Sequence, residues 1–171
     1  MSRADFRFAW RDRHVVRPGC AEDYEAIVAM LRALASDVAA PMTPKVDVAS
    51  LRRHGPDGDR RFDMLVASRQ DGPLDGLCLY GWTFSGWRGA AGLFVADLYV
   101  APTARGIRLG RGLLAAAIAR EAENGAAFIK LDVDHQNIGA IGFYEKLGFH
   151  VHHGERVMIL EADLLPALAD E

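Results

Sequence analysis

The sequence contains few cysteines, with only Cys20 and Cys78 among 171 residues. Two cysteines cannot form a disulfide framework, and these two lack the CxxC spacing of a metal-binding or redox motif. Cys78 stands inside an apolar run that predicts a strand, so we expect it to be a small buried hydrophobic residue. A chain of this length can bury a substantial core without cross-links, and we expect one domain over residues 1–171.

Long apolar runs and an excess of charge are also missing. No apolar run approaches the length that spans a bilayer, and the start of the chain lacks the apolar segment of a secretory signal. The net charge is −3, which gives no general attraction to nucleic acid or anionic lipid. We therefore expect a cytoplasmic protein with no nucleic-acid and no membrane partner.

Strand and helix patterns alternate along the chain after a loose lead-in at residues 1–12. Period-2 and helical spacings predict strands and helices in this order: strand 14–20, helices 21–39 and 46–55, strands 62–69, 77–85 and 91–102, helix 110–123, strand 126–134, helix 137–147, strands 149–153 and 156–162. The continuous apolar character of 126–134 predicts burial on both faces. The order predicts an α/β (mixed α+β) fold, with a central, mixed, mostly antiparallel twisted sheet of six to seven strands and helices on both faces.

The stretch "ARGIRLGRGLL" at residues 104–114 leads into a predicted helix. A helix N-terminus has unpaired N–H groups and a partial positive charge, so this stretch predicts an anion site. From Gly110 it reads GRGLLA, which matches the dinucleotide fingerprint, with Asp132 about twenty residues further on. However, Pro102 ends the preceding strand well before Gly110, and the chain lacks repeated βαβ units, so we disfavour a dinucleotide site.

The wider stretch "DLYVAPTARGIRLGRGLL" resembles motif A of the GNAT superfamily of N-acetyltransferases, whose loop reads Q/R-x-x-G-x-G/A. In that frame Arg105 is the leading basic residue, Arg108 stands where the first glycine belongs, and Gly110 is the last glycine. The resemblance implies a GNAT fold in which the pyrophosphate of acetyl-CoA is held by backbone N–H groups of Gly106, Ile107, Arg108, Leu109, Gly110 and Arg111. It also implies that pantetheine lies along the preceding strand at Leu98, Tyr99 and Val100.

A second stretch, "NIGAIGFYEKLGF" at residues 137–149, resembles motif B of the same superfamily, N-x-x-A-x-x-F-Y-x-x-x-G-F. Helical spacing places Asn137, Ala140 or Ile141, and Tyr144 along one face. The resemblance implies that Asn137, Ala140 and Tyr144 contact acetyl-CoA, and that Tyr144 is the general acid for the departing thiolate. The alternative for Tyr144 is an aromatic ring that packs on acetyl-CoA without a proton role.

Arg108 departs from the glycine of the family loop. A side chain at a positive φ costs on the order of 1 kcal/mol. Arginine keeps its backbone N–H, so the cradle survives where the local dihedrals are ordinary. Its side chain either folds over a phosphate as a clamp or lies in solvent, and the sequence leaves both open.

Acetyl transfer from a thioester to an amine needs a neutral amine, stabilisation of a developing oxyanion and a proton for the thiolate. Asp97 is the only charged residue in "GLFVADLYV", and a carboxylate in an apolar strand has a raised pKa, which suits a base. Its alternative role is structural, satisfied by an arginine or a backbone amide. The resemblance implies an oxyanion donor in a bulged part of the strand near Leu98 to Val100.

The segment "LYGWTFSGWRGAAGLFVADLYV" resembles the spermidine/spermine acetyltransferase-like subgroup. The subgroup's Glu-Asp pair reads Ala96-Asp97 here, so its water-positioning glutamate is absent. The likeness makes Asp37 and Asp97 candidate contacts for a small-molecule primary amine such as a polyamine, a diamine or a lysine-like amine. Trp82 offers an aromatic face to a cationic amine, although packing in the sheet is the simpler role for it.

Other functions stay open at this point. A non-catalytic acyl-CoA sensor and a protein lysine or N-terminal acetyltransferase are the alternatives to a small-molecule enzyme. The subgroup likeness also implies a homodimer. We expect no metal site, since His150, His152 and His153 have no cysteine or acid to complete a ligand set and fit a surface strand.

Overall fold

The computed structural model describes residues 5–11, 13–40, 42–70, 72–152, 154 and 156–165. The chain divides into two compact units, Met1–Asn137 and Ile138–Glu171, which are described separately below. The first unit contains the sheet and the helices that cover it, and the second contains α4 (Ile138–Glu145). The prediction of one domain therefore stays a prediction.

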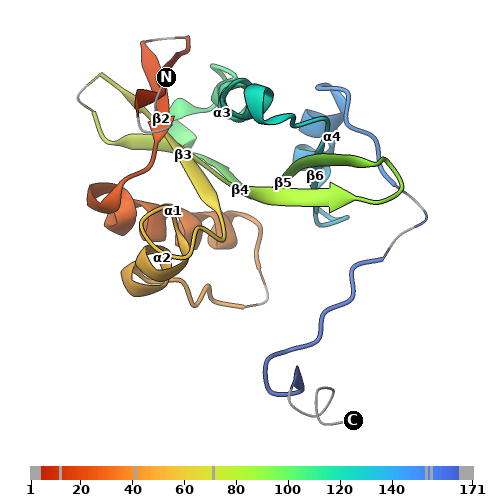
Figure 1. The fold of residues 1–171 in the computed structure, drawn as a ribbon. Helices are drawn as coiled ribbons and strands as arrows, with labels where there is room; N and C mark the ends of the chain where they lie inside the picture. The colour runs from red at the N-terminus through yellow and green to blue at the C-terminus, as the bar shows by residue number, and fades with distance from the viewer. Residues whose placement is uncertain are drawn as a thin grey trace. The chain divides into compact units, whose positions relative to one another are not determined.

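The described part of the first unit forms one six-stranded sheet whose strands follow one another in chain order. The strands are β1 (Phe8–Ala9), β2 (His14–Pro18), β3 (Asp63–Arg69), β4 (Leu74–Ser85), β5 (Ala90–Val100) and β6 (Ile129–Leu131). Neighbours from β1 to β5 pair antiparallel, and β6 pairs parallel to β5 (Figure 1). The structure thus confirms the predicted mixed, mostly antiparallel sheet.

Helices cover both faces of this sheet, as predicted (Figure 1). On one face lie α1 (Tyr24–Asp37) and α2 (Val48–His54), and on the other lies α3 (Leu109–Glu121). The first face is packed because α1 repeats apolar residues at helical spacing, and these join a core cluster with α2 and the strands. The second face is packed by Leu109, Leu113, Leu114, Ala116 and Ala117 of α3.

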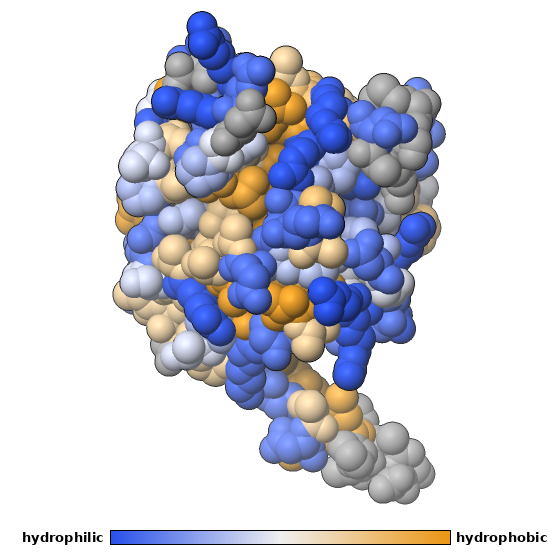
Figure 2. All heavy atoms as spheres, turned by 90° about the vertical axis from the view of Figure 1, so that its left-hand side faces the viewer, coloured by the Kyte–Doolittle hydropathy of each residue, from blue (hydrophilic) through white to orange (hydrophobic). Residues whose placement is uncertain are grey.

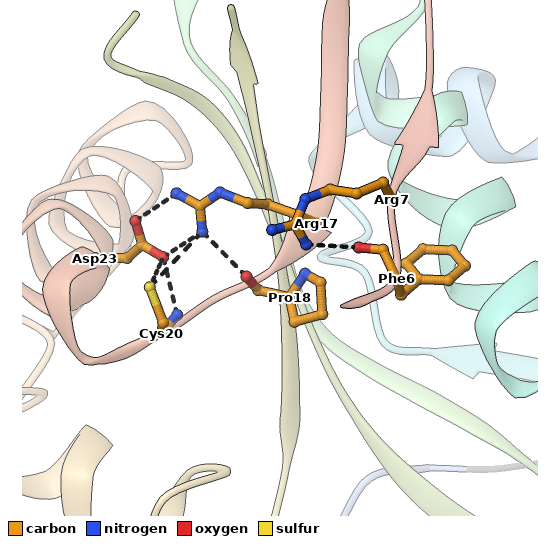
Figure 3. A network of polar contacts seen from close by, with 6 residues as sticks. All are labelled: Phe6, Arg7, Arg17, Pro18, Cys20 and Asp23. Carbon is orange, nitrogen blue, oxygen red and sulfur yellow. Dashed lines mark hydrogen bonds and ion pairs between the residues drawn. The ribbon is translucent and has the colours of Figure 1, made fainter. Parts of the chain in front are cut away.

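A partly buried ion pair lies at the turn between β2 and α1. Arg17 donates two hydrogen bonds to the carboxyl of Asp23, at 2.6 and 2.8 Å, and a third to the carbonyl of Pro18 at 3.1 Å (Figure 3). Burial alone would raise the pKa of Asp23, but the hydrogen bonds from Arg17 and from the Cys20 N–H outweigh it and hold the pKa below its ordinary value. The ion pair therefore sets the direction in which α1 leaves the sheet.

Three predicted features of the sheet are wrong. Residues 8–9 are not a loose lead-in, because they pair with Val15 and Val16 of β2. The strand predicted at 126–134 is reduced to β6, an edge strand whose residues are half-buried or exposed. The described residues of 149–153 and 156–162 form no strand, because apolar alternation gives a strand only where it has a partner to pair with.

The described residues contain no helix that is long and apolar enough to cross a membrane. On the face displayed in Figure 2, apolar surface occurs in small areas separated by hydrophilic side chains. Large exposed apolar side chains occur at the end of the β4–β5 hairpin, where Phe84 and Trp87 lie.

Gly112 of α3 is a close-packing position. A Cβ built on it would lie 2.6–2.8 Å from ring atoms of Trp10, so the indole ring lies directly on the backbone of α3. One glycine of the dinucleotide-like GxG spacing thus has a packing role within this fold.

We expect Gly112→Ala to lower the free energy of unfolding by about 1–3 kcal/mol, because the added methyl displaces the Trp10 ring. A double-mutant cycle with Trp10→Leu, measured by denaturant unfolding, tests the cause. The cost of Gly112→Ala should fall in the Trp10→Leu background. An equal cost in both backgrounds would contradict the packing role.

Candidate functional site

The loop between β5 and α3 has the backbone of an anion site. After the short 3-10 turn η3 (Pro102–Ala104), Gly106 and Arg108 have positive φ angles of 90° and 62°. The first hydrogen bond of α3 runs from the Gly112 N–H to the Arg108 carbonyl at 3.2 Å. The N–H groups of Leu109, Gly110 and Arg111 precede it and have no acceptor inside the helix. These donors can bind a negatively charged group.

Arg108 has the backbone conformation that the family loop assigns to a glycine. Its φ of 62° and ψ of 29° lie in the left-handed region, so its dihedrals are not ordinary for an arginine. Its side chain is exposed, and within the described part of the chain neither Arg108 nor Arg111 pairs with a carboxylate. The loop thus presents two available guanidinium groups beside the free N–H donors, which fits a phosphate ligand.

Arg105 and Asp37 contact each other. The sequence analysis places Arg105 in the phosphate loop and makes Asp37 a candidate contact for the amine. Arg105 forms an ion pair with Asp37 at the end of α1, and its Nε donates to the Val100 carbonyl at 3.2 Å. The ion pair joins the candidate phosphate loop to the helix on the other side of the strand end. Any anion that recruits Arg105 competes with Asp37 for it.

The second half of β5 is open on one side. β6 pairs only with residues Leu93 to Val95, whereas β4 pairs with every residue of β5 except Ala96. Among the described residues, the segment from Ala96 to Val100 has no strand partner on the β6 side. Apart from the Val100 carbonyl, which accepts from Arg105, its outward N–H and C=O groups have no strand partner and can bind an extended chain, and Leu98, Tyr99 and Val100 lie in this segment.

A bulge at Ala96 decides where Asp97 points. Asp97 is opposite Leu79 and Val95 is opposite Tyr80, so Ala96 has no partner on β4. The Tyr80 hydroxyl donates to Glu121 of α3 at 3.0 Å, which puts Val95 on the α3 face. The extra residue reverses the alternation, so Asp97 lies with Leu79 on the face covered by α1 and α2. The resemblance implies a bulge near Leu98 to Val100, and the structure has it just before that segment, at Ala96.

Asp97 lines a pocket of about 430 Å³ on that face. The walls come from α1, the α1–α2 connection, α2, the segment before β3, and the strands β4 and β5. The lining residues are Leu31, Leu34, Ala35, Val38, Ala40, Pro44, Lys45, Val46, Leu51, Phe62, Leu79 and Asp97. The pocket is thus mainly apolar, and Asp97 supplies its one carboxylate.

The carboxyl of Asp97 is in an apolar environment among the described residues. Burial raises the pKa of its carboxyl above the ordinary value. Within the described residues no arginine, lysine or backbone amide contacts the carboxyl, so the structure shows no partner for a purely structural aspartate. A carboxylate of this kind can bind a cation or accept a proton from a ligand.

Sequence analysis does not identify the apolar residues that form the walls of the pocket. Leu34, Val38 and Phe62 have the composition and spacing of ordinary core residues, and several elements that are distant in sequence contribute to the pocket. The apolar spacing of α1 continues to Val38, directly after the helix, but this signal does not separate a pocket wall from a core contact.

Trp82 is not brought together with Asp97. It is paired with Leu93 in the register of β4 and β5, on the same face as Tyr80 and opposite to Asp97. Its side chain is 41% exposed and does not line the pocket. Its role as an amine contact stays a prediction, and Trp82 is not part of this pocket.

The second unit carries the helix of the predicted motif B, with Ala140 and Tyr144 on α4. The Tyr144 ring makes edge contacts with Phe143 and Phe149, at centroid distances of 5.1 and 5.4 Å. The helix ends at Glu145, two residues before the predicted end at 147, and Gly148, the predicted cap, has a φ of 95°. Asn137 ends the first unit, where its N–H donates to the Asp134 carbonyl at 2.9 Å.

Both cysteine thiols have raised pKa values. Burial raises the pKa of Cys78 to about 12, and it is fully buried as predicted. Burial also raises the pKa of Cys20 to about 11, with further contributions from Glu22 and Asp23. A covalent route through a cysteine thiolate is therefore disfavoured near neutral pH.

The described residues contain no group of three or more histidine, cysteine or acidic side chains that could hold a metal ion. His150 and His152 are exposed and are not part of a strand, and His153 lies outside the described residues.

Comparison with known proteins gives the family. A model of the acetyltransferase (GNAT) family matches residues 3–149. No curated protein matches the sequence.

Solved structures share the fold. An integron cassette protein from the mobile metagenome of V. cholerae has a TM-score of 0.73 and 15% identity, and the match covers 93% of this chain and 99% of that one. A transcriptional regulator from Bacillus halodurans C-125 has a TM-score of 0.68 and 26% identity, over 85% and 98%. A Trypanosoma brucei acetyltransferase has a TM-score of 0.61 and 25% identity, over 86% and 99%.

Two substitutions at Arg108 separate its backbone from its side chain. Arg108→Gly should be more stable than Arg108→Ala by about 1 kcal/mol, because glycine adopts the left-handed conformation without the steric cost. Denaturant unfolding measures the difference. If the side chain clamps a phosphate, both variants lose acetyl-CoA affinity relative to the parent protein. Equal stabilities of the two variants would contradict the left-handed backbone.

Proposed function

The chain belongs to the acetyltransferase (GNAT) family, and on that premise we propose that it transfers the acetyl group of acetyl-CoA to a primary amine of a small molecule. Family membership makes it an acyltransferase, and one structural neighbour at 25% identity is an acetyltransferase. The observation that carries the small-molecule acceptor is the unpaired Asp97 carboxyl in a pocket beside the open half of β5.

The first unit offers a fitting surface for acetyl-CoA, which supplies an activated acetyl group when bound. The free N–H groups at the start of α3, with Arg108 and Arg111, would hold its pyrophosphate. The peptide groups from Ala96 to Val100 that face away from β4 would hold its extended arm. Asn137, Ala140 and Tyr144 are further contacts that the family resemblance implies.

Two side chains would move protons. An amine that arrives as an ammonium ion loses two protons in becoming an amide. Asp97 would accept the first, as its raised pKa suits a base. The amine nitrogen would form a bond to the acetyl carbon, and the C–S bond would break. Tyr144 would donate a proton to the departing sulfur. The second proton of the nitrogen would pass to Tyr144 and restore its hydroxyl group, and Asp97 would release the first to solvent, so the net release is one proton.

The transfer would be direct, from acetyl-CoA to the amine with both bound at once. The raised pKa values of Cys20 and Cys78 support this route, because neither thiol forms a thiolate readily.

A small-molecule acceptor is favoured over a protein substrate because the pocket has the volume of a ligand site, about 430 Å³. A homodimer and a cytoplasmic location stay predictions from the resemblance and the composition.

Calorimetric titration tests the proposed function. We expect acetyl-CoA to bind with a Kd on the order of 1–100 μM and NAD not to bind. Tyr144→Phe should keep this affinity within about twofold, and should lower kcat by roughly 10²-fold or more with the best acceptor of an amine panel.

Two results would contradict this account. Absence of acetyl-CoA binding would overturn the acetyltransferase function. Unchanged kcat in Tyr144→Phe would remove Tyr144 from the acid role and leave the rest of the proposal in place. Trp87→Phe, a substitution of an exposed side chain at the hairpin end, is the control for a general effect of aromatic replacement.

A further inference from the structure

The lining of the Asp97 pocket contains very little charge. Apolar side chains of α1, the α1–α2 connection, α2 and β4 form nearly all of it. Asp97 is the one acid in the lining, and Lys45, which is exposed, is the one base. A ligand that fills this pocket has most of its surface against hydrocarbon.

This charge pattern does not suit a polyamine. Each ammonium group taken out of water needs a paired carboxylate, because an unpaired buried charge is strongly unfavourable. Asp97 can pair with one ammonium group. Asp37, the second acid expected to contact the acceptor, instead forms an ion pair with Arg105 and does not line the pocket. Lys45 would repel a second ammonium group.

The size of the pocket is that of a small-molecule site. A volume of about 430 Å³ corresponds to roughly ten to fifteen water-sized groups at about 30 Å³ each. This space holds an alkylamine or an amine with an aromatic ring, but it is also large enough for a linear diamine, so the charge of the lining and not its size distinguishes between them.

Resting on the acetyltransferase function proposed above, we infer that the acceptor is a primary monoamine with an apolar alkyl or aryl body. The body occupies the space between α1, α2 and the sheet, and the amine nitrogen lies at Asp97. Specificity comes from the apolar walls, which admit the hydrocarbon, and from the single carboxylate, which admits one cationic group.

A matched pair of acceptors tests this inference. Hexylamine and 1,6-diaminohexane share a six-carbon chain and differ only at its far end, where an ammonium group of the diamine replaces one hydrogen atom of the terminal methyl group. With acetyl-CoA and the intact chain, thiol release should give a kcat/KM at least tenfold higher for hexylamine. From butylamine to hexylamine, kcat/KM should rise roughly fourfold for each added methylene, as expected when each one enters an apolar pocket.

A pair of variants tests whether this pocket is responsible. Val38 lines the pocket and is 37% exposed, so Val38→Asp adds a second carboxylate at a position that tolerates charge. It should shift the ratio of kcat/KM values at least tenfold toward 1,6-diaminohexane. Ile118→Asp, at an exposed position on α3 outside the pocket, should leave the ratio unchanged.

The outcomes separate the two proposals. Diamine or spermidine turnover equal to or better than that of hexylamine would overturn the monoamine inference and leave the acetyltransferase function in place. An unchanged ratio in Val38→Asp would overturn the location of the acceptor in this pocket. Bound acetyl-CoA with no transfer to any amine would overturn the inference and the amine-acceptor function together.

Discussion

The bulge at Ala96 is the constraint on which the candidate site depends. One unpaired residue between Val95 and Asp97 reverses the side-chain alternation of β5. Without it, Asp97 would share the α3 face with Val95, where Tyr80 and Glu121 already form a buried hydrogen bond. With it, Asp97 lies in an apolar pocket under α1 and α2, and in the part of the chain that the structure describes the same half of β5 has no partner on the β6 side.

This placement has a cost for stability, which is common at functional sites. The pKa of Asp97 is higher in the folded state than its ordinary value of 3.8 because burial disfavours the charged carboxylate. Its contribution to stability is therefore fully present below about pH 3.8 and is lost as the pH rises through the folded pKa. A bound cationic acceptor would offset this cost, so the folded protein should be more stable with the acceptor bound than without it.

Local patterns in the sequence predict most of the fold. The spacing of apolar residues gives α1, α2 and α3 and the strands β2 to β5, since each signal lies within one segment. The bulge at Ala96 depends on the pairing of two strands, and the Arg105–Asp37 ion pair joins residues 68 positions apart. Neither has a local signal, and the pocket walls look like ordinary core. The sequence does identify Asp97 by its charge within an apolar strand, but not the face on which it lies.

The most direct test of this account is the pKa of Asp97, measured by carbon-13 NMR of the carboxyl groups through a pH titration. Asp97→Asn identifies the resonance by its loss. The account predicts a midpoint above the ordinary aspartate value of 3.8, and a lower midpoint when hexylamine is bound, since a nearby ammonium group favours the carboxylate. A midpoint at or below 3.8 in the free protein would mean that the carboxyl faces water or a cation of the protein, and would contradict the placement of Asp97 in an apolar pocket.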